Sequence, residues 1–322
     1  MKAILVQQHG GPEELVPSDI AIPVPGKSQV LIRTIRASVN FADLMAVAGN
    51  YPVPSMPFVP GLDCYGEIVA VGADVDASRV GEKVVAFCDA GGYSEYSLAS
   101  EGLFFPVPDG IDPDQAGAAP LLLGTCYGLL TQASKLSPGA TVAVHAAAGG
   151  IGTTAIQMAL TLGASKVIGL VSSQAKAGVV ESLGASAIVA PETSNYAQQV
   201  IDVAGAPMDI ILNSVAGTTI AEDLEMLAPF GTLVTFGMAA GTPGVAYSNQ
   251  LHSTSRTFAG YSFGNLRRNR PSEVASLMLP TLEMLISGRI KMVIDSVLDL
   301  DQAANAHARL ASRLSIGKIL LK

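Results

Sequence analysis

Cysteine is scarce in this chain of 322 residues, and the few cysteines are scattered. Cys64, Cys88 and Cys126 lie far apart in the sequence and form no CxxC pair. A disulfide-stapled scaffold uses an even, dense set of cysteines, and a structural zinc site uses clustered ones. The sequence therefore excludes both classes, and a reducing compartment fits this cysteine usage best.

Charge is also low, and basic residues are the rarer kind. Charged residues make up 14% of the chain, and 27 acidic against 19 basic residues give a net charge of −8. A nucleic-acid-binding protein usually carries a basic patch that neutralises phosphates, so we expect no nucleic-acid partner. Hydrophobic residues account for 49% of the chain, which is typical of a folded protein with a large core. The length predicts about two domains.

No secretory signal or membrane span is expected. Acidic residues follow too soon in MKAILVQQHGGPEEL for a signal peptide. Two stretches without Asp, Glu, Lys or Arg, Leu136–Ser165 and Met226–Ser255, are interrupted by glycine and proline, for example at Pro138-Gly139 and Pro243-Gly244. A spanning helix needs about 20 apolar residues in one element. We therefore interpret both stretches as buried elements of a protein without membrane contact.

The pattern of apolar residues divides the chain into two kinds of structure. The first hundred or so residues contain short β-strand patterns such as QVLIRTIRASV and EKVVAFC, separated by turns. From about Leu121, the apolar strands TVAVHA, KVIGLV, DIILNS and TLVTFG alternate with helical segments of about ten residues. This alternation predicts βαβ units and a parallel sheet covered on both faces.

The C-terminal part is expected to return to the first domain. After about Asn265 the sequence predicts one long helix that Pro280 should kink or interrupt, and the chain ends in the strand GKILLK. The predicted fold class is therefore α/β, with a doubly wound parallel-sheet domain at 122–264 inserted into a β-rich domain formed by residues 1–121 and 265–322.

The turn after TVAVHA carries the most informative motif. Ala147-Ala148-Gly149-Gly150-Ile151-Gly152 is similar to the G-x-G-x-x-G fingerprint, with Ala in the first glycine position. In that fingerprint the second glycine lets the backbone approach a pyrophosphate, the third allows close helix–strand packing, and the helix N-terminus offers N–H groups to the anion. An isolated glycine motif also fits an ordinary tight turn, but this one follows a predicted strand and opens a predicted helix. We therefore predict a dinucleotide site that includes Ala147, Gly149, Gly150, Ile151 and Gly152.

The next strand lacks the acidic residue that is typical of NAD sites. An Asp or Glu about 20 residues downstream of the glycine turn binds the ribose 2′-hydroxyl of NAD. Here the strand continues into Ser172-Ser173-Gln174-Ala175-Lys176, and no acidic residue occurs from 115 through 180. Two hydroxyls and an ammonium can donate charge-assisted hydrogen bonds to a 2′-phosphate, which a carboxylate would repel. The sequence favours NADPH, although the two serines could also cap the next helix.

Segments along nearly the whole chain resemble one family. They are GGPEEL, PVPGKSQVLIR, SVNFADLM, GNYPVPSMPFVPGLDCYGEIVAVG, VGEKVVAF, GGYSEY, LGTCYGLL, VHAAAGGIG, DIILNSVAG, GTLVTFG and IGKILLK. In this order and spacing they resemble the medium-chain dehydrogenase/reductase superfamily, and within it the zinc-free quinone oxidoreductase (zeta-crystallin-like) branch. The resemblance implies that the β-rich domain is a GroES-like catalytic domain and that the inserted one is a Rossmann domain.

The zinc-free branch follows from residues that are missing. Relatives with catalytic zinc place Cys, Gly-His-Glu and a second Cys in three of these segments, where this chain has Asn40, Gly61-Leu62-Asp63 and Leu121–Leu123. A zinc site needs three or four N, S or O donors, and four scattered histidines do not supply them. We expect no metal. Without a Lewis acid, hydride transfer needs an acceptor that is already electrophilic, such as a quinone or an α,β-unsaturated carbonyl.

Two residues match the family's active-site loops. Asn40 can donate a hydrogen bond to a carbonyl or to the cofactor ribose, although by residue type it fits a loop cap equally well. Tyr51, with a phenol that is neutral at pH 7, can donate to the acceptor oxygen or simply form a wall of the pocket. The family commonly has Arg four residues before this tyrosine, and Val47 in that place suggests a more apolar acceptor pocket.

Further residues match the family's cofactor contacts. Thr125, Gly237 and Met238 match positions near the nicotinamide, and Lys176 matches a 2′-phosphate contact. Pro191 stands where an aromatic cofactor contact is expected. The other chemically capable side chains have more ordinary expectations: Asp43 and Asp63 fix loops, His145 ends a strand, and Cys126 is a buried, inert thiol.

Together these observations predict an NADPH-dependent reductase of quinones or conjugated enones. The acidic surface and the family's habit suggest a cytoplasmic homodimer that pairs through an edge strand near Arg256–Ser262. Two alternatives remain open. VHAAAGGIG also resembles the enoyl reductase domains of polyketide and fatty-acid synthases, which predicts an enoyl-thioester reductase instead. The third possibility is a non-enzymatic NADPH-binding protein with a structural or regulatory role, since fold likeness alone does not establish a function.

Overall fold

The computed structural model describes residues 1–53, 55–89, 91–190 and 195–322. They form two compact units, residues 1–123 with 266–322 and residues 124–265. The sequence predicts boundaries a few residues away, at the change of pattern near Leu121. In the structure this change falls inside a helix, α2 (Pro113–Gly128), which carries the chain from the first unit into the second.

The first unit is built on a seven-stranded sheet and a two-stranded sheet. The larger sheet has the order β14-β15-β3-β4-β5-β7, with β6 also pairing with β3, and β1 pairs with β2. The strands are β1 (Lys2–Leu5), β2 (Val16–Asp19), β3 (Gln29–Val39), β4 (Asp63–Val71), β5 (Lys83–Phe87), β6 (Tyr96–Ser100), β7 (Phe104–Pro106), β14 (Ile294–Leu298) and β15 (Lys318–Leu321). The C-terminal strand β15 runs antiparallel to the end of β3, opposite Ala37–Val39.

Strand β3 contributes side chains to two separate hydrophobic cores. Val30 and Ile32 are buried in one core, and Ala37 and Val39 in the other. Side chains alternate along a strand, so even and odd positions face opposite sides. The register with β4 shifts between Thr34 and Arg36, where β3 has one extra residue. Strand β3 therefore contributes to both cores, and it ends at Val39, directly before Asn40.

The helices of this unit are short, apart from α2 and α9. They are α1 (Phe41–Val47), α8 (Phe263–Asn269, which begins in the second unit), α9 (Val274–Ile286) and α10 (Ala303–Ala311), with 3₁₀ turns η1 (Pro12–Glu14), η2 (Ala77–Arg79), η5 (Pro271–Glu273) and η6 (Leu300–Gln302).

The long C-terminal helix expected from the sequence is divided at a different proline. The chain breaks between α8 and α9 at Pro271, while α9 runs through Pro280. Pro280 has no N–H to donate within the helix, which weakens the hydrogen-bond ladder there. The Thr281 hydroxyl donates to the carbonyl oxygen of Leu277 at 2.9 Å, and Leu277 and Leu282 are buried on either side. Packing and this side-chain bond maintain the helix, so the predicted interruption at Pro280 is wrong.

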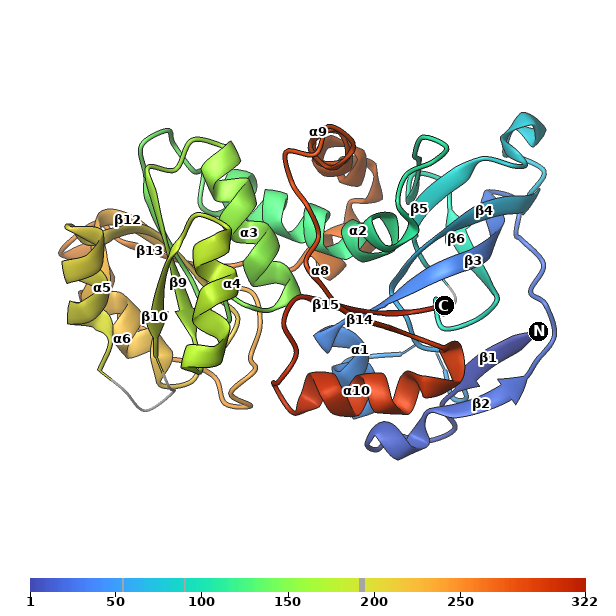
Figure 1. The fold of residues 1–322 in the computed structure, drawn as a ribbon, viewed down its shortest axis with the longest axis horizontal. Helices are drawn as coiled ribbons and strands as arrows, with labels where there is room; N and C mark the ends of the chain where they lie inside the picture. The colour runs from blue at the N-terminus through green and yellow to red at the C-terminus, as the bar shows by residue number, and fades with distance from the viewer. Residues whose placement is uncertain (54, 90, 191–194) are drawn as a thin grey trace. The chain divides into compact units, whose positions relative to one another are not determined.

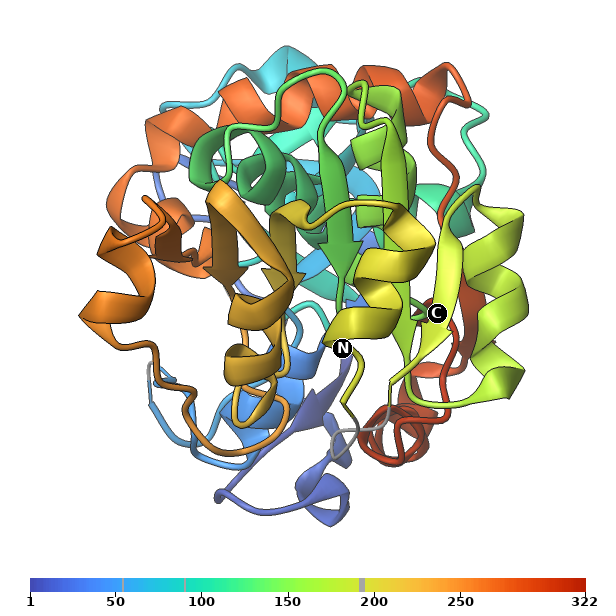
Figure 2. The same ribbon diagram turned by 90° about the vertical axis from the view of Figure 1, so that its left-hand side faces the viewer.

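The second unit contains a six-stranded parallel sheet (Figures 1 and 2). Its order is β10-β9-β8-β11-β12-β13, which is the doubly wound arrangement, and the order reverses between β8 and β11. In Figure 1, α3 and α4 lie on one face of the sheet and α5 and α6 on the other. The elements are β8 (Thr141–Val144), α3 (Gly150–Thr161), β9 (Lys166–Val171), η4 (Gln174–Lys176), α4 (Ala177–Ser182), β10 (Ser186–Val189), α5 (Ala197–Ala204), β11 (Met208–Asn213), α6 (Thr219–Met226), β12 (Leu227–Thr235), α7 (Ser248–His252) and β13 (Thr257–Gly260), preceded by the π-turn η3 (Leu129–Ala133).

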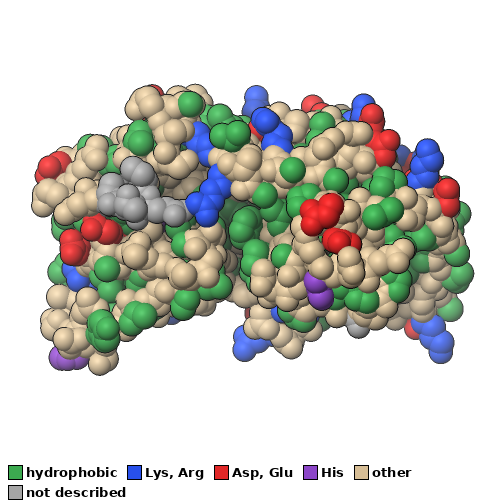
Figure 3. All heavy atoms as spheres, turned by 90° about the horizontal axis from the view of Figure 1, so that it is seen from below, with side chains coloured by type: hydrophobic (Ala, Val, Ile, Leu, Met, Phe, Trp, Pro, Cys, Tyr) green, Lys and Arg blue, Asp and Glu red, His purple; other side chains and the backbone are tan. Residues whose placement is uncertain are grey.

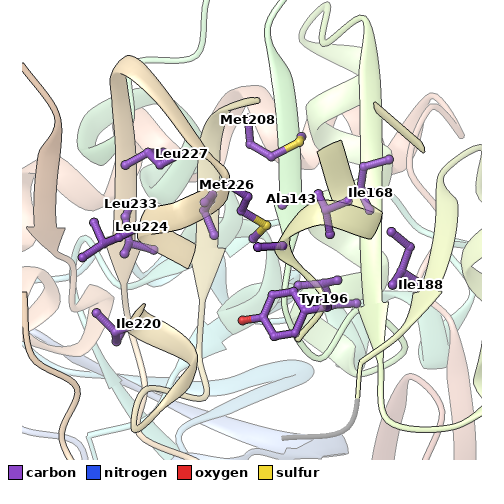
Figure 4. Close-up of a cluster of buried hydrophobic side chains, with 14 residues drawn as sticks. Ala143, Ile168, Ile188, Tyr196, Met208, Ile220, Leu224, Met226, Leu227 and Leu233 are labelled. Atoms are coloured by element: carbon purple, nitrogen blue, oxygen red, sulfur yellow. The ribbon is translucent and has the colours of Figure 1, made fainter. Parts of the chain in front are cut away.

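The central strands of this sheet are buried on both faces, as the continuous apolar runs predict. One of the two faces is filled by the cluster in Figure 4, to which strand residues such as Ala143, Ile168 and Ile188 and Leu224 of α6 belong. Burying a Leu or Ile side chain stabilises the fold by roughly 1.5–3 kcal/mol. The core therefore holds the carboxyl ends of the strands in fixed register.

Helix hydropathy and surface charge describe the outside of the molecule. No helix among the described residues combines the length and the hydropathy needed to cross a bilayer. On the face that Figure 3 shows, acidic and basic side chains are interspersed with hydrophobic and uncharged ones.

Candidate active site

The glycine turn lies at the carboxyl end of β8, beside the point where the strand order reverses. Gly149 is the N-cap of α3, and helix α3 has 12 residues, long enough for a useful dipole at its N-terminus. A Cβ added to Gly149 would meet only the Ala146 carbonyl oxygen, at 3.3 Å, among the described residues. The backbone of the turn is therefore open to a ligand at the position where the fingerprint requires it.

The other positions of the motif have different structural reasons. A Cβ at Gly152 would lie 2.5 Å from the Ala146 oxygen and from the Cα of Ala147, so only glycine fits there. Ala147 is fully buried, and its N–H donates to Leu170 of β9 at 3.0 Å. The methyl group of Ala147 at the first glycine position is therefore accommodated inside the fold. Gly150 and Ile151 form the first turn of α3, where the backbone N–H groups have no acceptor within the helix itself.

The end of β9 presents hydroxyl groups beside this turn. Ser172 and Ser173 are exposed directly after β9, and Lys176 closes the 3₁₀ turn η4. Ser173 occupies the N-cap position of η4, but its side chain makes no capping hydrogen bond within the described structure. The alternative role of this serine as a cap is therefore not favoured. Pro191, where the family has an aromatic contact, lies outside the described residues.

The loop after β12 lies against the turn after β11. The N–H of Ala239 donates to the Ser214 carbonyl at 3.0 Å, and a Cβ at Gly237 would come within 2.8 Å of the same oxygen. Met238 is 43% exposed in this loop. Gly237 and Met238 thus lie next to the strand end that borders the reversal of strand order.

Helix α2 brings Thr125 and Cys126 next to the glycine turn. The Cys126 thiol donates to the Ile151 carbonyl oxygen at 3.4 Å. Burial raises the pKa of the Cys126 thiol far above its ordinary value, so this cysteine is an unreactive core residue, as the sequence analysis expected. Thr125 is half-buried beside it.

Asn40 and Tyr51 belong to the first unit, at either end of the segment that contains α1. Asn40 is the N-cap of α1 and is only 4% exposed. Both the nitrogen and the oxygen of its side-chain amide form hydrogen bonds. Its Nδ2 donates to Asp63 at 2.8 Å, and its Oδ1 accepts from the Lys318 ammonium. The amide of Asn40 thus orders the loop, and it can donate to a ligand only by sharing or leaving Asp63.

Tyr51 has a more open position. Its residue is 45% exposed, and its hydroxyl makes no hydrogen bond to the residues that the structure describes. Its backbone N–H donates to the Met45 carbonyl at 3.2 Å, which ties the turn to α1. Val47, in contrast, is 2% exposed and packs in the core with Ile4 and Val6. The expectation that Val47 makes the acceptor pocket more apolar is not supported, because its side chain faces the core.

A buried charged cluster of Asp43, Asp63 and Lys318 supports this loop, and Lys318 was not predicted from the sequence. Asp43 accepts from the Asn40 N–H at 2.8 Å, and Asp63 accepts from the Ser38 hydroxyl at 2.5 Å. Burial raises the pKa of Asp43 to about 6 and lowers the pKa of Lys318, while the two carboxylates favour the charged lysine. The only sign of Lys318 in the sequence is a lysine within the apolar strand IGKILL.

The described residues offer no cluster of metal ligands. Among them, no group of three or more His, Cys, Asp or Glu side chains is arranged to hold a metal ion.

The second unit has a parallel sheet with an open glycine turn at the point where the strand order reverses, and the first unit is rich in β-strands. This combination is typical of a nucleotide-dependent dehydrogenase or reductase. Similarity to known proteins agrees. A family model described as an alcohol dehydrogenase GroES-like domain matches residues 26–109, and one described as a zinc-binding dehydrogenase matches residues 150–280. A quinone oxidoreductase of Pseudomonas aeruginosa is 34% identical over 328 aligned positions, covering 99% of each chain.

Solved structures share the whole fold. Escherichia coli quinone oxidoreductase complexed with NADPH is 27% identical with a TM-score of 0.91, covering 100% of this chain and 99% of that one. The human synaptic vesicle membrane protein VAT-1 homolog-like protein is also 27% identical, with a TM-score of 0.88 over 100% and 98% of the two chains. The chain belongs to the quinone oxidoreductase branch of the medium-chain dehydrogenase/reductase superfamily. It is an oxidoreductase of that type.

Proposed function

We propose that this protein is a zinc-independent reductase that transfers hydride from NADPH to a quinone or an α,β-unsaturated carbonyl compound. The observation that carries the proposal is the pairing of an open glycine turn at Gly149 with exposed Ser172 and Ser173 after the next strand. This edge of the sheet has hydroxyls and a lysine where NAD sites have a carboxylate. The relative crystallised with NADPH supports the same choice of cofactor.

Different residues of the second unit bind different parts of NADPH. The N–H groups at Gly149–Gly152 and the dipole of α3 hold the pyrophosphate, and Ser172, Ser173 and Lys176 hold the 2′-phosphate. Thr125, Gly237 and Met238 border the nicotinamide. When bound, NADPH supplies a hydride from its nicotinamide ring.

The first unit supplies orientation and a hydrogen-bond donor. The exposed hydroxyl of Tyr51 donates a hydrogen bond to the acceptor oxygen, which gains negative charge as hydride arrives. Asn40, held by Asp63 and Lys318, orders the loop that carries Tyr51 and directs its amide toward the ligand when Asp63 is shared. Relatives that contain zinc have its ligands at the positions of residues 40, 62 and 121–123. In this chain none of these residues is a usual zinc donor.

The acceptor class decides between this proposal and its closest alternative. Steady-state oxidation of NADPH should be faster with a simple quinone or enone than with a crotonyl-type thioester. Turnover should be unchanged after dialysis against a chelator, with less than one zinc per chain by elemental analysis. Much faster turnover of the thioester would favour an enoyl-thioester reductase, and tight NADPH binding without turnover of any acceptor would favour the non-enzymatic role.

The assembly state is a second part of the proposal. Strand β13 is the outer strand of the parallel sheet and covers most of Arg256–Ser262. Edge strands expose unpaired N–H and C=O groups that can bond to a second copy. We propose that the protein is a cytoplasmic homodimer that pairs through β13.

A further inference from the structure

A buried carboxylate in the second unit lies outside every role assigned above. Asp223 of α6 is fully buried. Its Oδ1 lies 2.7 Å from Nε2 of His145 and accepts from the Tyr196 hydroxyl at 3.0 Å, and its Oδ2 accepts from Nδ2 of Asn213 at 2.5 Å. Because a carboxylate only accepts, the His145 proton is on Nε2. Three donors on one carboxylate compensate for its burial.

Through Asn213 the carboxylate controls the turn that follows β11. The Oδ1 of Asn213 accepts from the N–H groups of Val215 and Ala216, at 2.7 and 2.8 Å. Ala216 has φ +61°, a left-handed conformation that is costly for a residue with a side chain. The turn keeps this conformation because Asn213 holds both N–H groups. Asp223 and the Thr219 hydroxyl, which accepts from the same Nδ2 at 2.8 Å, fix which way the Asn213 amide faces.

Through His145 the same carboxylate controls the turn that follows β8. His145 directly precedes Ala146, which has φ +49°, the second left-handed alanine of this unit. Ala146 begins the glycine turn, and its carbonyl oxygen lies against Gly149 and Gly152. Anchoring the His145 ring restrains the backbone at the entry to that turn, where the strain must be held by the surroundings.

These two turns follow β8 and β11, the two strands between which the order of the sheet reverses. We propose that Asp223 is a positioning residue for the cofactor: from inside the core it holds both walls of the NADPH site in their strained conformations. The inference rests on the proposed function, because it assigns NADPH to this edge of the sheet. Asp223 itself does not contact the cofactor and acts through His145 and Asn213.

The test uses one disruptive variant, one rescue and one matched control in the full-length protein. In Asp223→Asn, an amide nitrogen that donates replaces a carboxylate oxygen that accepts, so it faces His145, Tyr196 and Asn213, which already donate. The double variant Asn213→Asp with Asp223→Asn moves the carboxylate to position 213, where it can still accept from Val215 and Ala216. The new amide oxygen at position 223 then accepts from His145 and Tyr196. Tyr196→Phe removes the hydroxyl that bonds to the same carboxylate and to the Thr219 carbonyl oxygen, keeps the ring that packs against His145, and leaves the hydrogen bonds of Asn213 and His145 to Asp223 in place.

NADPH affinity and amide exchange are the readouts. Titration of NADPH fluorescence should show affinity about tenfold weaker in Asp223→Asn, equivalent to about 1.4 kcal/mol, with recovery in the double variant and no change in Tyr196→Phe. Hydrogen exchange without cofactor should be faster at the Val215 and Ala216 amides in Asp223→Asn only. The number of NADPH sites per chain should stay unchanged, because a general loss of folding would reduce the number of sites without weakening the affinity of those that remain.

The outcomes separate this inference from the proposed function. Wild-type protein that does not bind NADPH would overturn the proposed function. Wild-type affinity in Asp223→Asn, or equal weakening in Tyr196→Phe, would overturn the positioning role alone. If Asp223→Asn does not fold, His145→Leu breaks only the link to the glycine turn and should weaken NADPH binding to a smaller extent; unchanged binding there would also contradict the inference.

Discussion

At the scale of single residues, hydrogen-bond partners decide what a side chain can do. Asn40 and Tyr51 are similarly placed by motif, yet Asn40 is bonded at both ends of its amide, while the hydroxyl of the exposed Tyr51 has no such partner among the described residues. The partners of Asn40 come from residues 63 and 318, far away in the sequence. Residue type alone therefore leaves both roles open for Asn40, and the tertiary contacts favour the loop-ordering one.

Lys176 offers the sharpest residue-scale prediction. Lys176→Ala should raise the Michaelis constant for NADPH about tenfold, with little change for NADH, because only the 2′-phosphate loses a charge-assisted hydrogen bond. The steady-state constants for both cofactors measure it. Lys27→Ala removes the same charge from an exposed site of the first unit and should change neither constant. Equal effects on the two cofactors would show that Lys176 does not contact the phosphate.

At the scale of elements, short connections carry the function. The β8–α3 turn combines a left-handed alanine, an N-capping glycine and a glycine without room for a side chain within a few residues. Helix α9 illustrates the opposite case, because packing around Pro280 maintains a helix that local rules would interrupt. The local sequence predicts a turn well when the geometry of the turn demands glycine. It predicts the end of a helix less well where burial compensates for an unfavourable residue such as Pro280.

Two glycine substitutions test the element scale with opposite signs. Gly152→Ala should destabilise the protein by about 1–3 kcal/mol and abolish NADPH binding, since the new Cβ would overlap the turn at 2.5 Å. Gly178→Ala lies within α4, where no described residue beyond the adjacent helix backbone is within 4 Å of an added Cβ, and should stabilise by about 0.5–1 kcal/mol. Chemical denaturation and NADPH titration measure both. A stable Gly152→Ala protein with normal NADPH affinity would disprove the packing argument.

At the scale of the whole molecule, two units with different sheets are made from one chain. The C-terminal strand β15 returns to pair with β3 and brings Lys318 to the buried loop at residue 40. Among the described residues, the parallel sheet of the second unit has no such closing strand beyond β13, and this is the edge through which we propose that a second copy pairs.

The homodimer is tested at that edge. Thr257→Lys places a charge on the exposed start of β13 and should shift the protein from dimer to monomer, because a lysine on an edge strand opposes strand pairing. Light scattering after gel filtration gives the mass. Thr161→Lys adds the same charge at an exposed position of α3 and should leave the dimer intact. A monomeric wild type, or a dimeric Thr257→Lys, would contradict pairing through β13.

The sequence by itself determined the alternation of strands and helices, the position of the glycine turn and the missing carboxylate after β9. These features depend on local patterns: apolar periodicity, glycine where no side chain fits, and the residue type at a strand end. Only the tertiary structure decided that β3 serves two cores, that Asn40 is held by Asp63 and Lys318, and that Asp223 joins two strained turns. Such contacts link residues far apart in the chain, and hydrogen-bond geometry and burial arise only once the chain has folded.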